Sequence, residues 1–148
     1  FNRRYFFEQA EKLREEEPLS VIILDVDHFK AFNDTHGHAV GDSVLQQVAA
    51  TCKKVAADSA LLARYGGEEF VLATTRTDEV EDLAERLRRE VEATIVPTDK
   101  GRNLAVTISV GVAGGATSVE SLLKAADEAL YLAKEQGRNR VVAAAWQT

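Results

Sequence analysis

Two adjacent glycines, Gly66 and Gly67, lie between two short apolar runs at residues 61–65 and 70–74. Glycines between strand-like segments predict a β-hairpin, because glycine reaches the positive φ that a two-residue turn requires. Two adjacent glutamates follow the glycines, so the hairpin would carry both carboxylates at its tip. Acidic residues also keep strand edges soluble, and the hairpin alone therefore does not distinguish a functional site from a surface turn.

A second segment favours a functional site. Four consecutive apolar residues, 21–24, predict a buried strand, and Asp25 and Asp27 follow where that strand ends. Carboxylates beyond the end of a buried strand are a common place for chemistry in α/β sheets. Together with the hairpin glutamates they would suit Mg²⁺, which prefers oxygen ligands, and Lys30 adds a positive charge for phosphate. Asp-x-Asp alone is weak evidence, because aspartate is also a turn former.

The remaining pattern alternates helices and strands in the order β-α-β-β-α-β-α-β. We expect helices over residues 2–16, 41–58, 78–95 and 118–136, strands over 20–26, 61–65, 70–74, 104–113 and 139–144, a loop or short helix at 27–39, and a turn at 99–103. Thr117 and Glu120 form a capping-box start for the last helix, and Gly137 suits the position after its end. The central β-α-β-β-α-β is the ferredoxin-like pattern. We therefore predict an α/β (α+β) fold with a sheet of about five strands.

Composition excludes several classes. A chain of 148 residues suits one domain, and its net charge of −6 disfavours nucleic-acid binding through a basic face. No run approaches the roughly 20 apolar residues of a membrane-spanning helix. The single cysteine, Cys52, fits a reducing compartment and is interpreted as a packing residue of a helix. Because the chain lacks methionine and begins at Phe1, we expect it to be a segment of a longer protein.

In their order and spacing, these motifs resemble the diguanylate cyclases, whose GGDEF domain is named for its Gly-Gly-Asp/Glu-Glu-Phe motif. The matching stretches are residues 2–4, 25–30, 33–35, 37–38, 41–42, 64–70, 109–112, 126–131, 134 and 137–139. The resemblance implies one GGDEF domain over 1–148 with a truncated N-terminal signature and a polymerase-palm-like sheet. It implies a cytoplasmic signalling domain under regulatory input from outside this segment, and leaves membrane anchoring of the full-length protein open.

The activity that the resemblance implies is a nucleotidyl transfer. Two GTP molecules condense to cyclic di-GMP, a bacterial second messenger, and two pyrophosphates, at the interface of two copies of the domain. The implied metal, Mg²⁺ or Mn²⁺, is held by Asp25, Glu68 and the main-chain carbonyl of Val26. Glu69 is the implied general base or second metal ligand, and Arg64 would stabilise developing phosphate charge. Asp27 is either a further ligand or a support for the site.

Asn33 and Asp42 match the family's guanine-binding pair. A carboxylate can accept from guanine N1–H and N2–H₂ together, and an amide can face O6 or N7. Adenine presents the opposite pattern, so GTP would be preferred over ATP. Without the resemblance, Asp42 would be interpreted as a first-turn acid that complements a helix dipole, and Asn33 as a turn residue.

Several positive groups are candidates for the triphosphate. The resemblance implies substrate contacts from the side chains of Lys30, Lys134 and Arg138, the main-chain N–H groups around His28 and Phe29, and the glycines Gly66 and Gly67. Successive main-chain N–H groups form anion-binding concavities. Cations near the end of a helix are also common as simple partners of the helix dipole. This is the alternative interpretation of Lys134 and Arg138.

The sequence departs from the family at one functional position. Family members often carry an inhibitory, product-binding Arg-x-x-Asp before the glycines, and Ala57 and Ala60 stand there. Alanines offer neither guanidinium nor carboxylate, so we predict that the inhibitory site is absent. A zinc site at His36 and His38 is rejected, because zinc sites use three or four ligands and no further ligand is nearby.

Three other functions compete with the cyclase. The main alternative is a catalytically inactive module that senses GTP or cyclic di-GMP. The second is a cyclase that makes a cyclic mononucleotide, and the third is a purely structural interaction domain. All five hairpin motif positions, 66–70, are intact, which favours the enzyme.

Overall fold

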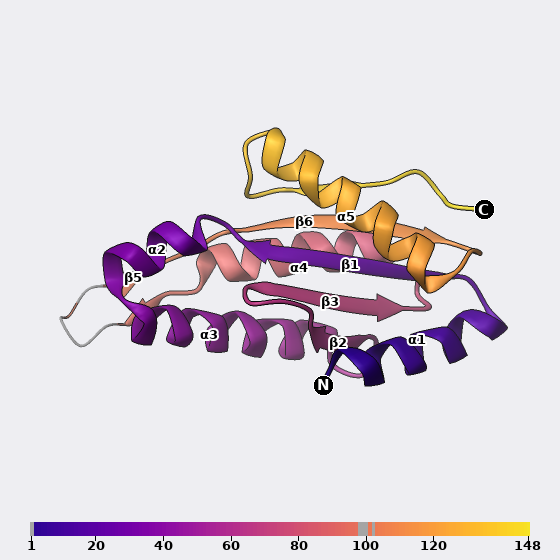
Figure 1. Ribbon diagram of the computed structural model, residues 1–148, viewed down its shortest axis with the longest axis horizontal. Helices are drawn as coiled ribbons and strands as arrows, with labels where there is room; N and C mark the ends of the chain where they lie inside the picture. The colour runs from indigo at the N-terminus through magenta and orange to yellow at the C-terminus, as the bar shows by residue number, and fades with distance from the viewer. Residues whose placement is uncertain (1, 98–100, 102) are drawn as a thin grey trace.

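The computed structural model describes residues 2–97, 101 and 103–148 (Figure 1). Its elements are α1 (Arg3–Glu16), β1 (Leu19–Val26), α2 (Phe29–His36), α3 (His38–Ala56), β2 (Leu61–Arg64), β3 (Glu69–Thr74), α4 (Val80–Ala93), β4 (Val96–Pro97), β5 (Asn103–Leu104), β6 (Ile108–Gly115), α5 (Val119–Glu135) and β7 (Val141–Ala143). Among the described residues, no helix combines the length and the apolar character needed to cross a membrane.

Five strands form one mixed sheet in the order β2-β3-β1-β6-β7. The first four are antiparallel neighbours, whereas β7 runs parallel to β6. This is the ferredoxin-like arrangement with one added strand, so the predicted fold class is confirmed. Strand β1 lies in the centre, and its carboxyl end therefore meets both the β2–β3 connection and the start of β6.

Both faces of the sheet are covered, which explains the continuous apolar run in β1. Ile22 and Leu24 pack with residues of α3 and α4, whereas Val21 and Ile23 pack with residues of α1 and α5. Side chains alternate between the two faces along a strand. Asp25 therefore belongs to the face that α1 and α5 cover, and this places its carboxylate near the end of α5.

The strand predicted over 104–113 is wrong at its start. Residues 103–104 form β5, which pairs with β4 in a separate two-residue ladder, and β6 begins only at Ile108. The predicted turn at 99–103 lies partly outside the described residues. The strand predicted over 139–144 is also shorter, because Arg138 and Asn139 have φ values of 64° and 48°, which an extended strand does not accommodate.

The capping residue of the last helix lies one position later than predicted, and the helix begins at Val119. Ser118 has extended backbone, with φ −63° and ψ 154°, and its side chain accepts a hydrogen bond from the Ser121 N–H. The capping residue is therefore Ser118, and Thr117 lies outside the helix. The predicted position of Gly137 is confirmed, because this glycine directly follows the C-cap Gln136. Its positive φ of 122° is a conformation that glycine adopts readily.

Cys52 is buried in α3. Burial raises the pKa of its thiol to about 12, because the low-dielectric interior disfavours the thiolate. This agrees with the interpretation of Cys52 as a packing residue, since a nucleophilic cysteine requires an accessible thiolate.

Gly111 on β6 is expected to be essential for packing α5 against the sheet. A Cβ there would lie 2.1 Å from the carbonyl oxygen of Ala126 and 2.4 Å from the nitrogen of Leu130. Since these are main-chain atoms of α5, Gly111→Ala should lower the free energy of unfolding by about 2 kcal/mol or more. The measurement is the denaturant midpoint, with Gly67→Ala as the matched control, because a Cβ at residue 67 meets no atom within 4 Å. An unchanged midpoint for Gly111→Ala would contradict the packing.

Candidate active site

Three elements meet at one end of the sheet: the carboxyl end of β1, the β2–β3 connection and the carboxyl end of α5 (Figure 1). Asp25 on β1 pairs directly with Glu69 on β3. The Val26 N–H donates to the Glu68 carbonyl oxygen at 3.2 Å, and Lys134 Nζ lies 2.5 Å from Asp25 Oδ2. The end of β1 and the hairpin therefore lie side by side, as a site shared by their acids requires. Directly opposed residues share a sheet face, so Asp25 and Glu69 project toward α5 together.

Asp25 is more buried than the hairpin acids Glu68 and Glu69, and its carboxylate contacts the ammonium group of Lys134. The residue is 7% exposed; its Oδ2 bonds Lys134, and its Oδ1 is buried without a hydrogen-bond partner among the described residues. An unpartnered buried carboxylate oxygen is costly and fits a site that a hard cation completes. The ammonium group of Lys134 partly neutralises Asp25 in the present arrangement.

The protein ligands for such an ion are few. Within the described residues, no three His, Cys, Asp or Glu side chains are grouped to hold a metal. Mg²⁺ is usually bound through one or two carboxylates plus substrate phosphates and water. Asp25, with its unpartnered Oδ1, and the hairpin acids could supply carboxylates of this kind.

Glu69 has an unusual electrostatic environment. Burial raises its pKa, and the negative charges of Asp25, Asp127 and Glu68 raise it further, while Lys134 lowers it. Glu69 therefore retains its proton to higher pH than an exposed glutamate. The pKa of Glu69 is higher in the folded state than in the unfolded state. The folded state therefore loses stability as the pH rises from the unfolded-state pKa through the folded-state pKa, because Glu69 must then ionise in a half-buried, negatively charged environment. A half-buried carboxyl group with a raised pKa is suited to proton transfer.

Asp127 is a residue of this site to which the sequence analysis gave no role. It lies on α5 and lines a cavity of about 320 Å³ between α1, α5 and β3. Glu69, Lys124 and Phe7 line the same cavity. The available signal was its spacing: Asp127 precedes Lys134 by seven residues, about two helical turns, so the two share a face of α5.

The hairpin turn differs from the prediction. Neither Gly66 nor Gly67 has a positive φ. The N–H groups of Tyr65 and Gly66 both donate to the Glu69 carbonyl oxygen, at 2.8 and 3.3 Å, so the connection between β2 and β3 covers residues 65–68 instead of two residues. A Cβ at Gly67 would meet no atom within 4 Å. The glycine at that position leaves open main chain that a ligand can approach.

Arg64 extends from the end of β2 over this turn. Its Nε and Nη2 donate to the Gly67 carbonyl oxygen at 3.2 and 2.5 Å. The guanidinium group therefore supports the turn while one side of it stays exposed. An exposed, oriented cation at this position is available to a phosphate group as well.

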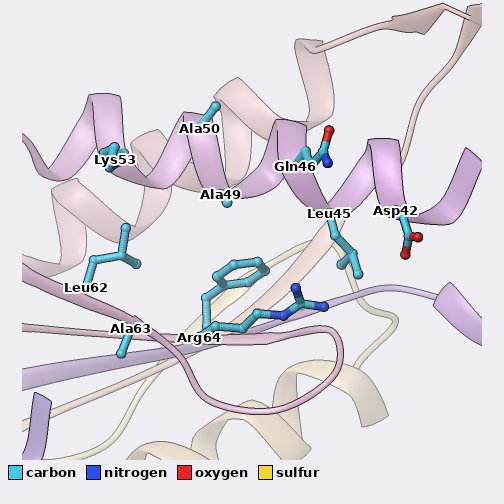
Figure 2. Close-up of a pocket in the computed structure, with 10 residues that line it drawn as sticks. Asp42, Leu45, Gln46, Ala49, Ala50, Lys53, Leu62, Ala63 and Arg64 are labelled. Atoms are coloured by element: carbon cyan, nitrogen blue, oxygen red, sulfur yellow. The ribbon is translucent and has the colours of Figure 1, made fainter. Parts of the chain in front are cut away.

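A cavity of about 690 Å³ lies between α3 and the β2–β3 hairpin. Figure 2 shows Asp42 and Lys53 at opposite ends of its α3 wall, with the Arg64 side chain extending toward the Asp42 end. Its other lining residues are mostly apolar: Leu45, Gln46, Ala49, Ala50, Leu62, Ala63 and Phe70. An apolar cleft of this size with a few charged groups is typical of small-molecule sites.

Asn33 lies beside this cavity but is not among its lining residues. Its side chain packs against Gly41, where a Cβ would lie only 1.7 Å from Asn33 Oδ1. That oxygen is buried and has no hydrogen-bond partner among the described residues. The structure thus places the side chain of Asn33 against Gly41, which immediately precedes Asp42. Because Gly41 has no Cβ, it leaves the space that the Asn33 side chain occupies.

The predicted phosphate contacts lie on two turns. His28 has a left-handed φ of 56° and precedes the buried Phe29 at the start of α2, with Lys30 exposed in its first turn. The first N–H groups of a helix lack helical partners and attract anions. Arg138 lies on the turn after α5 with a φ of 64°. These residues share the end of the sheet that carries Asp25.

The positions of the inhibitory motif carry no charge. Ala57 follows α3 and is exposed, and Ala60 precedes β2 and is half-buried. His36 packs against Phe32 with ring centroids 4.6 Å apart and ring planes tilted by 49°, and His38 begins α3.

A family model described as "Diguanylate cyclase, GGDEF domain" matches residues 1–140. Diguanylate cyclase DosC of Escherichia coli strain K12 is 45% identical over 128 residues, which cover 84% of this chain and 28% of that protein. Response regulator PleD of Caulobacter vibrioides is 42% identical over 152 residues, or 95% of this chain and 34% of the relative. The chain therefore spans about a third or less of these curated relatives.

Solved structures agree with the sequence relatives. The GGDEF domain of DgcB from Caulobacter crescentus, in complex with c-di-GMP, superposes with a TM-score of 0.90 at 38% identity, covering 96% of this chain and 87% of that one. The active GGEEF domain of a diguanylate cyclase from Vibrio cholerae gives a TM-score of 0.86 at 30% identity, with coverage of 99% and 98%. The similarity thus extends over the sheet, its helices and the hairpin.

Proposed function

The chain belongs to the GGDEF family of diguanylate cyclases, and we propose that it condenses two GTP molecules into cyclic di-GMP and two pyrophosphates. One observation carries this proposal: Asp25 at the end of β1 lies directly opposite Glu69 of the intact Gly-Gly-Glu-Glu-Phe hairpin. We further propose that residues 1–148 are one GGDEF domain of a longer protein, with its regulatory input outside this segment.

Each half of the reaction forms one phosphodiester bond. The 3′-oxygen of one GTP attacks the α-phosphorus of the other, the bond from that phosphorus to the bridging oxygen breaks, and pyrophosphate leaves. Glu69 receives the 3′-hydroxyl proton, in keeping with its raised pKa. A bound Mg²⁺ or Mn²⁺ would be held by Asp25, Glu68 and the Val26 carbonyl, and it would neutralise charge on the reacting phosphate.

The binding groups divide between base and phosphates. Asp42 accepts from guanine N1–H and N2–H₂ in the cavity beside α3, and Asn33 faces O6 or N7. The triphosphate extends toward the hairpin and the start of α2, where it meets these groups: Lys30, the N–H groups of His28 and Phe29, Arg64, Gly66, Gly67, Lys134 and Arg138. When a divalent ion binds Asp25, we expect the ammonium group of Lys134 to leave Asp25 and contact the phosphates instead.

A cyclic product needs two domains face to face, because one domain supplies one nucleotide site. In the dilute range, the rate per domain should rise in proportion to domain concentration, and fusion to a dimerising partner should remove this dependence. The measurement is cyclic di-GMP formation across a dilution series with GTP and Mg²⁺. A rate per domain that stays constant while sedimentation shows only monomer would contradict the proposal.

Gly41 is expected to control guanine binding through Asn33. In Gly41→Ala the new Cβ overlaps the Asn33 side chain and displaces it. The lost hydrogen bond to guanine, worth about 1–1.5 kcal/mol, should weaken GTP binding about tenfold. Titration with GTP measures this, and Asn33→Ala is the control. If both changes act through one contact, the double variant binds no more weakly than Asn33→Ala alone. Two full, additive losses would contradict the coupling.

Product inhibition through residues 57–60 is expected to be absent. Ala57 and Ala60 provide no charged group for a guanine nucleotide, so cyclic di-GMP should inhibit only by competing with GTP. Initial rates at several product concentrations give the inhibition pattern. Noncompetitive inhibition that disappears when residues 57–60 are mutated would show that this prediction is wrong.

A further inference from the structure

Asp27 is a buried acid that lies two residues after Asp25, and its carboxylate binds three residues from two other segments of the chain. It is 7% exposed. Its Oδ2 accepts from Thr107 Oγ1 at 2.6 Å and from the Asn139 N–H at 3.0 Å, and its Oδ1 accepts from Ser109 Oγ at 2.6 Å. Both carboxylate oxygens are therefore engaged by protein donors, in contrast to Asp25.

The two turns that this carboxylate joins have unfavourable backbone conformations. His28, the next residue, has a φ of 56°, and Gly137, Arg138 and Asn139 have φ values of 122°, 64° and 48°. Left-handed backbone is disfavoured for residues with a side chain, and it persists only where surrounding contacts fix it. Asp27 supplies such a contact by holding the Asn139 N–H directly.

The turn after α5 has a second attachment, through the side chain of Asn139. Its Oδ1 accepts from Arg88 Nη1 at 3.0 Å, and its Nδ2 donates to Glu92 Oε2 at 2.5 Å. Both partners lie on α4. The main chain of residue 139 is thus bound from the β1 side and its side chain from the α4 side, which leaves the preceding Arg138 at a fixed position.

We propose that Asp27 is a positioning residue, which holds the His28 turn and the 137–139 turn together as one triphosphate subsite. It acts through the main chain and touches neither nucleotide nor metal. This inference rests on the proposed function, because the two turns carry the proposed phosphate contacts Lys30 and Arg138. Of the two roles that the sequence left open for Asp27, metal ligand or support for the site, this inference selects the support and specifies what Asp27 holds.

The geometry predicts a difference between two substitutions. In Asp27→Asn, the amide oxygen can still accept from Thr107 and the Asn139 N–H, while the amide N–H₂ donates to the Ser109 hydroxyl, which also accepts. In Asp27→Ala, all three bonds are lost and the 137–139 turn is released. A residue that bound the metal or the phosphates through its charge would be impaired by both changes.

The test compares the affinity for a GTP analogue with the affinity for guanosine, which carries no phosphate. The analogue has a methylene bridge between the α- and β-phosphorus atoms, so it cannot release pyrophosphate during the titration. Both titrations contain Mg²⁺. We expect Asp27→Ala to reduce the affinity advantage of the GTP analogue over guanosine by about 10–100-fold. Guanosine affinity should stay near that of the parent, and Asp27→Asn should recover most of the advantage.

Two results would overturn the proposal. One is an Asp27→Asn variant as impaired as Asp27→Ala, because the charge itself would then matter. The other is an unchanged advantage in Asp27→Ala. If Asp27→Ala does not fold, the double variant Thr107→Val, Ser109→Ala removes the two hydroxyl donors that orient the Asp27 carboxylate toward the Asn139 N–H. A carboxylate without this orientation holds the 137–139 turn less firmly, so the double variant should reduce the same ratio. An unreduced ratio there contradicts the proposal equally. A parent domain that binds no GTP would instead contradict the proposed function.

Discussion

A Glu69→Gln variant is expected to bind GTP and form no measurable cyclic di-GMP. The amide has the size of the carboxylic acid but cannot take the proton of the attacking 3′-hydroxyl. General-base catalysis typically contributes about 10²–10⁴-fold, so the rate should fall by at least that range. GTP affinity should change by no more than a few-fold. Separation of the nucleotides after incubation measures the product, and titration with the methylene-bridged GTP analogue measures binding.

The matched control for Glu69→Gln is Glu120→Gln. Glu120 is an exposed glutamate that lines the same cavity beside α5, and it lies outside the hairpin motif. This control should retain the parent rate, because removing one charge from the cavity wall leaves the proposed base intact. A Glu69→Gln variant that turns over at the parent rate would assign the base to another group.

Removal of the Asp25 charge is expected to abolish metal-dependent activity while the fold survives. Asp25→Asn takes away a proposed carboxylate ligand, and metal ions contribute several kcal/mol to such reactions. The rate should therefore fall more than about 100-fold. The fold should remain, because the side chain of Lys134 is 35% exposed and its ammonium group can reach water. The measurement is Mn²⁺ binding by electron paramagnetic resonance in the presence of the GTP analogue, beside thermal unfolding.

Asp58→Asn is the control for that experiment. Asp58 is exposed between α3 and β2 and lies outside the proposed metal site. Its replacement removes the same charge from the domain without removing a ligand. Equal Mn²⁺ affinity in the parent and in Asp25→Asn would remove Asp25 from the metal site, and equal losses in both variants would point to a general charge effect.

The core of the site could be predicted from local sequence signals. An apolar run that ends in Asp25 specifies a central strand with both faces covered, and two short strands around paired glycines specify a hairpin. The ferredoxin-like order then places these two features side by side. The cross-strand pairing of Asp25 with Glu69 is the direct result, because register on a buried face is strongly fixed by the alternation of side chains.

The supporting contacts could not be predicted in the same way. Asp27 binds residues 80, 82 and 112 positions away, and no local pattern encodes such pairings. The hairpin glycines were assigned a positive φ that they do not adopt, because the actual connection is longer than two residues. Positive φ occurs instead at positions that include Arg138 and Asn139. Asparagine adopts left-handed backbone more readily than most residues, whereas arginine gives no such signal, and tertiary contacts hold Asn139 in place.

The ratio of pyrophosphate to cyclic dinucleotide tests the central claim most directly. The purified domain, at high concentration or fused to a dimerising partner, would be incubated with GTP and Mg²⁺, and both products would be quantified, the nucleotide by mass spectrometry. The proposed reaction predicts cyclic di-GMP with two pyrophosphates for each molecule formed. One pyrophosphate for each cyclic mononucleotide would contradict the condensation of two GTP molecules, and bound GTP without pyrophosphate release would identify a sensing module instead.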